Sequence, residues 1–238
     1  MTDSLESSVI ARNVRTVLDR IRQAALRVGR QPDSVRLVAV TKSVSSDHIR
    51  PAIEAGVKIL GENRLQEAIP KMAAIGPGDE VRWHFIGRLQ RRKVKAVVGK
   101  FQLIHSVDSV ELAVEINRRA EEAGLIQEVL LEVNIAGESS KGGFAPGELP
   151  EALAAVEALP NLSVKGLMVV PPLTTDPERT RPHFRAVRDL ARSLVGRGLG
   201  RIGMEELSMG MSHDYEVAVE EGATLVRVGT AIFGARHA

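Results

Sequence analysis

The chain has 238 residues, with 32 Lys and Arg against 30 Asp and Glu, and it contains no cysteine. The near balance of charge argues against a nucleic-acid-binding protein, which usually carries a large basic excess. The absence of cysteine excludes disulfides, thiolate catalysis and cysteine-ligated zinc. The N-terminus lacks the apolar core of a signal peptide, and no apolar run is long enough to cross a membrane. We therefore expect a cytoplasmic protein without a membrane partner.

The N-terminal segment, residues 2–29, has apolar residues from Val14 to Val28 at spacings of three and four, which predicts a helix. We expect this helix to pack outside the rest of the fold or to plug one end of it. After it, apolar β-rich runs alternate with helical patterns. The predicted strands are 35–41, 57–61, 81–87, 102–107, 127–135, 163–170, 204–208 and 224–228.

Helical patterns separate these strands. They are predicted at 46–55, 64–74, 88–95, 108–123, 148–159, across the stripe Phe184, Val187, Ala191 and Leu194, and at 214–221. The segment 88–95 is strongly basic, and it is either a solvated helix face or a contact for an acidic partner. Asp108 with Glu111 resembles a capping box, and Gly76 to Asp79 is predicted to form a turn.

Eight alternating strand–helix units predict an α/β fold, a (β/α)8 TIM barrel in one domain spanning residues 1–238 with the extra N-terminal helix at 1–30. An open doubly wound sheet is the alternative. In a barrel, functional groups collect where the strands end. Those positions hold Lys42, Asn63, His84 with Arg88, Ser106, Asn134, Met168, 208–212 and 227–230.

Two small-residue turns, 209–212 and 229–230, follow the seventh and eighth strands. Backbone N–H groups at such turns suit an anion, usually a phosphate. Two consecutive turns of this kind predict a shared phosphate site, as after the last two strands of many barrels.

Closure of the barrel would place Lys42 across from Arg227 and the turn at 229–230. Lys42 is then either a cation that pairs with the phosphate or a lysine that forms a Schiff base with a phosphate-bearing aldehyde, and its position leaves both open. Arg227 points into the barrel with Leu225. It either forms a buried salt bridge with Glu132 or Glu205, or it donates to a ligand heteroatom.

Several ordered motifs are similar to those of the pyridoxal phosphate homeostasis protein family, and the resemblance extends from about Arg36 to Arg236. The motifs are LVAVTK, GENRLQE, WHFIGRLQ, SVDS, SSKGG, GLMVV and LSMGMSHDYEVAVEEGATLVRVGTAIFG. The resemblance implies a barrel like the N-terminal domain of alanine racemase, holding pyridoxal 5′-phosphate (PLP) as an internal aldimine on Lys42.

The resemblance also assigns roles to other residues. Arg227 would face the pyridine nitrogen and Asn63 would lie near the ring. The phosphate would be held by Met209, Gly210, Ser212, Gly229 and Thr230. Arg88 and Arg92 stand where many relatives have His and Asn, so we assign no role to that loop.

An arginine at the pyridine nitrogen stays protonated and donates, so the ring nitrogen is expected to remain unprotonated, which disfavours transamination. Racemisation needs a second acid or base. Tyr215, His84 and Lys141 are candidates that are more simply structural, and the sequence ends at Ala238 directly after the barrel.

We therefore expect a monomeric PLP carrier that acts in PLP homeostasis without obligatory catalysis, with PLP-dependent apoenzymes as partners. The alternatives are a PLP-dependent amino-acid racemase, or a barrel that binds a sugar phosphate and uses Lys42 only as a cation.

Overall fold

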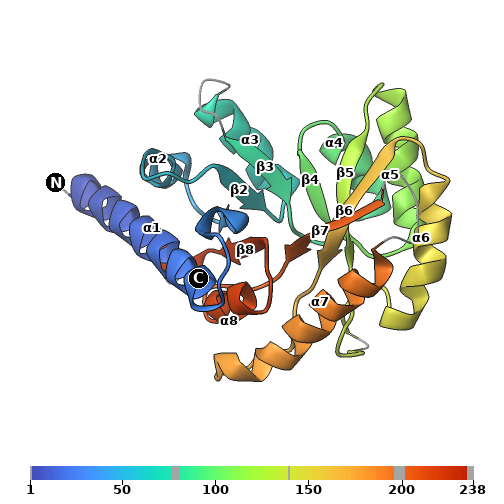
Figure 1. Cartoon of the computed structure of the whole chain (residues 1–238). Coiled ribbons are helices and arrows are strands. Elements are labelled where there is room, and N and C mark those ends of the chain that lie inside the picture. The colour runs from blue at the N-terminus through green and yellow to red at the C-terminus, as the bar shows by residue number, and fades with distance from the viewer. Residues whose placement is uncertain (1, 77–80, 139, 196–201, 235–238) are drawn as a thin grey trace.

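Eight parallel strands close into a barrel in sequence order, with β1 beside β8 (Figure 1). The computed structural model describes residues 2–76, 81–138, 140–195 and 202–234, with side chains from residue 6 onward. The strands are β1 (Arg36–Val40), β2 (Ile59–Glu62), β3 (Arg82–Phe85), β4 (Leu103–Val107), β5 (Gln127–Glu132), β6 (Leu162–Met168), β7 (Ile202–Ser208) and β8 (Leu225–Val228). The predicted barrel is confirmed, and the open sheet is excluded.

Helices lie between the strands and cover the outside of the barrel (Figure 1). The α-helices are α1 (Thr2–Arg27), α2 (Ser46–Glu54), α3 (Leu65–Ile75), α4 (Val94–Val97), α5 (Val110–Glu122), α6 (Leu149–Glu157), α7 (Arg181–Leu194), α8 (Tyr215–Glu220) and α9 (Thr230–Phe233). The short 3₁₀ turns are η1 (Pro32–Ser34), η2 (Arg91–Lys93), η3 (Pro146–Glu148) and η4 (Pro177–Thr180). Among the described residues, no helix is both long and apolar enough to span a membrane.

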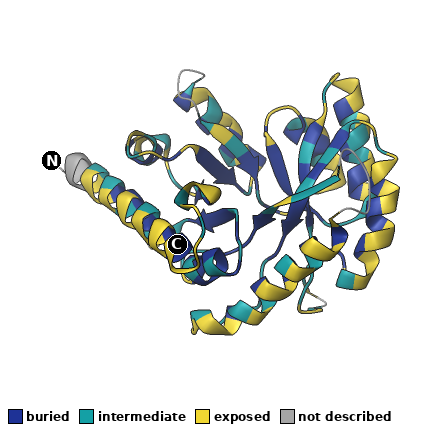
Figure 2. Cartoon of the chain, viewed as in Figure 1, coloured by how far each residue is buried: buried dark blue, intermediate teal, exposed yellow. Residues whose placement is uncertain are grey.

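Alternation along the strands divides the core into two parts, because successive side chains point to opposite faces. The smaller part fills the barrel interior and comprises Val38, Ile59, Leu103, Leu130, Met168 and Leu225. The larger part lies between the barrel and its helices, and Figure 2 shows most strands as buried, whereas the first half of β7 is partly exposed. The interior faces of β3, β4, β7 and β8 also carry polar side chains, which build part of the site described below.

Helix α1 packs outside the barrel against α2, α8 and α9, and it does not plug an end (Figure 1). Its inner stripe includes Ile10, Val14, Val17 and Ile21, all buried, while its outer face is exposed (Figure 2). The Asn13 side chain donates to the Ile232 carbonyl oxygen at 2.9 Å. Helix α1 is therefore fastened to the chain just after β8.

Three local predictions differ from the structure. The basic segment 88–95 is an extended stretch, the turn η2 and the start of the four-residue helix α4, so it is not one helix face. The N-cap of α5 is Ser109, whose hydroxyl accepts from Leu112 N at 3.3 Å, and Asp108 instead accepts from Ser109. Strand β5 ends at Glu132, because only an isolated bridge from Val133 to Phe144 follows it. Most of the turn predicted from Gly76 lies outside the described residues.

Candidate functional site

Lys42 and the turn after β8 come together because β1 and β8 are neighbours. Val38 is level with Arg227 and Ala39 with Val228 in the strand register. Gly229 follows directly, and a Cβ at Gly229 would lie 3.3 Å from the Val40 Cβ. The closure thus brings residues from opposite ends of the sequence to one edge of the barrel, as predicted.

Lys42, Gly229 and Thr230 line one cavity of about 720 Å³. Helix α1 contributes Glu6, Val9, Ile10 and Asn13 to its wall, so the N-terminal helix covers the cavity from outside. Its remaining lining residues are Val40, Ser43, Val44, His48, Ile232, Phe233 and Gly234. His48 Nε2 lies 2.9 Å from Glu6 Oε2, which joins α2 to α1 at the rim.

Ser212 connects the turn after β7 to the turn after β8. Its hydroxyl oxygen accepts from Gly229 N at 3.2 Å and from Ala231 N at 3.3 Å. A hydroxyl that accepts two amide protons still has its own proton to donate. Ser212 therefore presents a donor beside Thr230, as a phosphate site requires.

Gly210 allows the first turn to lie close to α8. It adopts φ of 91°, and a Cβ would come within 2.5 Å of the Ala218 Cβ and 3.0 Å of the Tyr215 Cα. Only glycine avoids both the strained backbone and the contact. Asp214, at the start of α8, accepts from Met211 N at 2.7 Å and orders the rest of the turn.

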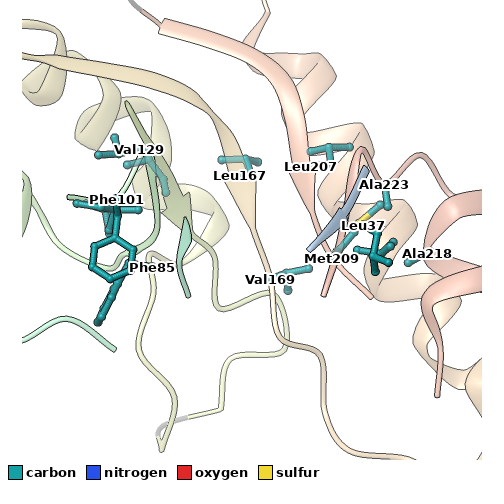
Figure 3. Packing of buried hydrophobic residues seen from close by; sticks show 14 of the residues in the cluster. Leu37, Phe85, Phe101, Val129, Leu167, Val169, Leu207, Met209, Ala218 and Ala223 are labelled. Carbon is teal, nitrogen blue, oxygen red and sulfur yellow. The ribbon is translucent and has the colours of Figure 1, made fainter. Parts of the chain in front are cut away.

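Met209 belongs to the hydrophobic core beneath this turn. Its side chain is fully buried and belongs to the same hydrophobic cluster as Leu37, Ala218 and Ala223 (Figure 3). Its amide donates to the Leu225 carbonyl oxygen at 3.1 Å. This geometry therefore favours a supporting position for Met209 over direct contact of its side chain or amide with a ligand.

Arg227 is buried in the barrel and satisfied by neutral partners. Its Nη1 donates to the Ser208 carbonyl oxygen at 2.7 Å and to Ser208 Oγ at 2.6 Å, and its Nη2 donates to the Val169 carbonyl oxygen at 2.8 Å. Burial lowers the pKa of Arg227 to about 10, so the guanidinium still carries its proton at neutral pH. These three bonds use three of the five guanidinium N–H donors, which leaves two for a further acceptor.

The predicted salt-bridge alternatives for Arg227 are wrong for the described residues. Glu205 is exposed, and Glu132 influences Arg227 through its charge without an ion pair between them. Burial raises the pKa of the Glu132 carboxyl, and the charge of Asp108 adds to the effect.

A buried hydrogen-bond chain extends from Arg227 across the barrel interior. Ser208 Oγ lies 2.8 Å from His105 Nδ1, and His105 Nε2 lies 2.9 Å from His84 Nδ1. Burial lowers the pKa of His84 to about 3 and that of His105 well below its ordinary value. Both rings are neutral at pH 7, so each has one donor and one acceptor nitrogen for the chain. His84 thus lies inside the barrel and not at its mouth.

Asn63 follows β2 and lies away from the Lys42 cavity. It lines a separate cleft of about 220 Å³ with Arg64, Gln66 and Arg88 among others. A Cβ at Gly87 would lie 2.5 Å from the Asn63 carbonyl oxygen, so the two loops pack closely. The Asn63 Oδ1 atom is buried without a hydrogen-bond partner. Its predicted place near a ring remains a prediction.

The remaining candidates have structural partners. Asn134 holds its own loop through Glu138, and Lys141 donates to Glu138, Val170 and Pro171. Tyr215 is buried with Arg20 over its ring, as expected for packing. The Ser106 hydroxyl donates to the Gly87 carbonyl oxygen, and Met168 lies in the interior core. The part of the chain that the structure describes contains no cluster of His, Asp and Glu suited to a metal ion.

Sequence reasoning missed a charged group beside Lys42. Lys71 and Glu67 bond the backbone before and after it, and Glu62 accepts from the Thr41 hydroxyl. The signal was present, because Glu62 and Glu67 belong to the GENRLQE motif that was interpreted only for Asn63.

The parallel barrel with a lysine after β1 and small-residue turns after β7 and β8 places this chain in the class of barrels related to the N-terminal domain of alanine racemase. Residues 10–237 match the family model described as alanine racemase, N-terminal domain. A protein of Aquifex aeolicus named pyridoxal phosphate homeostasis protein is 47% identical over 220 residues, covering 92% of this chain and 95% of the relative. The protein of that name from Escherichia coli K12 is 40% identical, covering 95% of this chain and 97% of the relative.

A solved structure is also similar over nearly its full length. PipY of Synechococcus elongatus PCC7942, with PLP bound, superimposes with a TM-score of 0.78 at 39% identity, covering 90% of this chain and 99% of that one. The chain belongs to the pyridoxal phosphate homeostasis protein family.

Proposed function

We propose that this protein binds PLP and takes part in PLP homeostasis in the cytoplasm. The observation that carries the proposal is the meeting of Lys42 with the turn at Gly229 and Thr230 in one cavity. PLP has an aldehyde and a phosphate, so it needs an amine and an anion site within the length of one small molecule. The related protein PipY has been solved with PLP bound.

The donor set fits PLP. Lys42 would hold the aldehyde carbon as a Schiff base, and PLP so bound supplies an electrophilic carbon that exchanges between amines. Ser212, Gly229 and Thr230 would hold the phosphate, with Gly210 shaping the turn and Met209 supporting it. Arg227 would donate to the ring nitrogen. Asn63 would lie near the ring, consistent with its unpartnered buried oxygen.

The protonated Arg227 favours storage of PLP over amino-acid turnover. A donor at the ring nitrogen keeps that nitrogen unprotonated, which weakens the electron sink that transamination needs. Racemisation would need a second proton-transfer group, and Tyr215 is occupied in packing against α1 through Arg20. We therefore propose a monomeric carrier whose partners are PLP-dependent apoenzymes.

The absorbance spectrum of the purified protein tests the cofactor proposal. A visible Schiff-base band is expected in the wild type and is expected to vanish in Lys42→Ala. Lys58→Ala serves as the control, because Lys58 is exposed and precedes β2 at the opposite end of the barrel. If the wild-type protein shows no such band after incubation with PLP, the PLP proposal is wrong, and the remaining interpretation is a phosphate site in which Lys42 acts only as a cation.

Catalysis is tested separately on the PLP-loaded protein. Incubation with single L-amino acids in D₂O is expected to give no steady exchange of the α-proton. Sustained exchange that disappears in Lys42→Ala would replace the carrier with a racemase. Size-exclusion chromatography with light scattering tests the monomer.

A further inference from the structure

Two side chains of α3 hold the main chain on both sides of Lys42. Lys71 Nζ donates to the Thr41 carbonyl oxygen at 2.6 Å, and Glu67 Oε2 accepts from Ser43 N at 2.6 Å. Glu67 and Lys71 are one helical turn apart, with 3.6 Å between Nζ and Oε2. One helix face therefore binds the residue before Lys42 and the residue after it.

The Lys71 contact is anchored in a buried ion pair. Lys71 Nζ lies 2.7 Å from Glu62 Oε1, and the side chains are 9% and 0% exposed respectively. The Thr41 hydroxyl donates to the same carboxylate oxygen at 2.7 Å, and Thr41 N donates to the Gly61 carbonyl oxygen at 3.0 Å. Buried charges need such close pairing to be tolerated, so the end of β1 is fixed to β2 and α3 together.

The Glu67 contact holds a strained residue. Ser43 has φ of 61°, in the left-handed region that residues with a side chain adopt only at a cost. Val44 N donates to the Thr41 carbonyl oxygen at 3.0 Å and closes the turn around Lys42. The Ser43 amide also lowers the pKa of the Glu67 carboxyl, which keeps that carboxylate charged.

We propose that Glu67 and Lys71 are positioning residues that fix the backbone of Lys42 so that its amine reaches the aldehyde of PLP. The inference rests on the proposed function. The Lys42 amine adds to the aldehyde carbon, and the two amine protons leave with the carbonyl oxygen as one water when the C=N bond forms. The strained turn is retained because it aims the lysine side chain into the cavity that it shares with Thr230.

The rate of PLP loading distinguishes positioning from simple stabilisation. The protein is stripped of cofactor with hydroxylamine, dialysed and mixed with PLP, and growth of the Schiff-base band is followed. Lys71→Met and Glu67→Leu are expected to load about tenfold to hundredfold more slowly, as is usual for a misplaced reactive group. Glu67→Gln keeps an acceptor for the Ser43 amide and is expected to load near the wild-type rate.

Arg36→Met is the matched control. Arg36 begins β1, the same strand, and pairs with Glu206 at the far end of the barrel. Its loss removes an ion pair from β1 without touching the turn around Lys42. Thermal unfolding of every variant in the stripped state reports the loss of stability separately from the loading rate.

Slow loading in Lys71→Met and Glu67→Leu, with Glu67→Gln and Arg36→Met near the wild type, supports the proposal. Loading at the wild-type rate in both disruptive variants, or equal slowing in Arg36→Met, overturns it and leaves a structural role. If Lys71→Met does not fold, the Glu67→Leu and Glu67→Gln pair decides. If the wild-type protein never forms the band, the proposed function is wrong, and this result differs from those that overturn the positioning roles of Glu67 and Lys71.

Discussion

The two halves of the candidate site hold their parts with different kinds of group. In the β1–α3 half, charged side chains hydrogen-bond to the backbone on either side of Lys42, and Ser43 has a strained backbone conformation. In the β7–α9 half, main-chain amides meet the hydroxyl of Ser212, and Gly210 shapes the turn. The second half also contains a carboxylate, Asp214, which bonds within the turn because its Oδ1 accepts from the Met211 amide.

The difference follows from the charge of the group in each half, which is a lysine in the first and would be a phosphate in the second. A lysine tolerates carboxylates nearby, because opposite charges attract. A phosphate is repelled by carboxylates, so amides and hydroxyls must provide its donors. The first half therefore depends on side-chain charge, and the second depends on backbone shape.

Lowering the pH is expected to give the largest effect on the free energy of unfolding, through the histidine chain that adjoins the β7–α9 half. The histidine chain ends at Ser208, directly before the turn after β7. His84 has a pKa of about 3 when folded. Histidines in the unfolded chain take up protons below a pH of about 6.5, so the free energy of unfolding falls as the pH drops from there toward 3, by about 3 kcal/mol at pH 4.5 from His84 alone.

Glu67 in the Lys42 half adds little to this loss of global stability at pH 4.5. The pKa of Glu67 is lowered, so its contribution is present above its unfolded pKa of about 4.3 and is lost only as the pH falls through the lower folded value. Urea unfolding at pH 7 and pH 4.5 measures the effect. His84→Asn should show a smaller drop than the wild type, with His183→Asn as control, and identical drops in all three would contradict the histidine account.

Gly210→Ala should break the amide half while sparing the Lys42 half. The positive φ and the 2.5 Å approach to the Ala218 Cβ are expected to cost about 2 kcal/mol of unfolding free energy. PLP retention in dialysis should fall, whereas the residual Schiff-base band keeps its wavelength. Gly147→Ala is the control, because a Cβ there meets nothing within 4 Å. A shifted band with retention unchanged would show that the turn acts on the ring and not on the phosphate.

Ser212→Ala should weaken retention with a smaller loss of stability. One hydroxyl donor to a charged phosphate is worth about 1.5 kcal/mol, so the dissociation constant should rise about tenfold. Equilibrium dialysis against PLP measures it, and Ser212→Thr, which keeps the hydroxyl, should retain most of the affinity. Equal affinity in Ser212→Ala would place the phosphate elsewhere.

Ser109→Ala should affect neither half and gives the smallest effect. Loss of the α5 cap is expected to reduce the free energy of unfolding by about 1 kcal/mol. PLP loading and retention should stay at wild-type values. Asp108→Ala, which removes no bond to the Leu112 amide, should cost less, and the opposite order would restore Asp108 as the cap.

Local pattern determined the barrel and the strand ends. The alternation of strand and helix is visible in apolar periodicity, and Lys42 with the turns at 209–212 and 229–230 could be placed because a strand end is a local property. The motif resemblance named the family, which the full-length relatives bear out.

Only the tertiary structure decided which groups meet. Arg227 bonds to Ser208 and Val169 and not to Glu132 or Glu205, since barrel closure sets which polar atoms lie within reach. Met209 faces the core because Ser208, the last residue of β7, points into the barrel, so the side chain that follows it points outward. Lys71 is 30 residues from Thr41 in sequence, and nothing in its own segment predicts that contact. Such partnerships depend on distances between elements, which local periodicity does not contain.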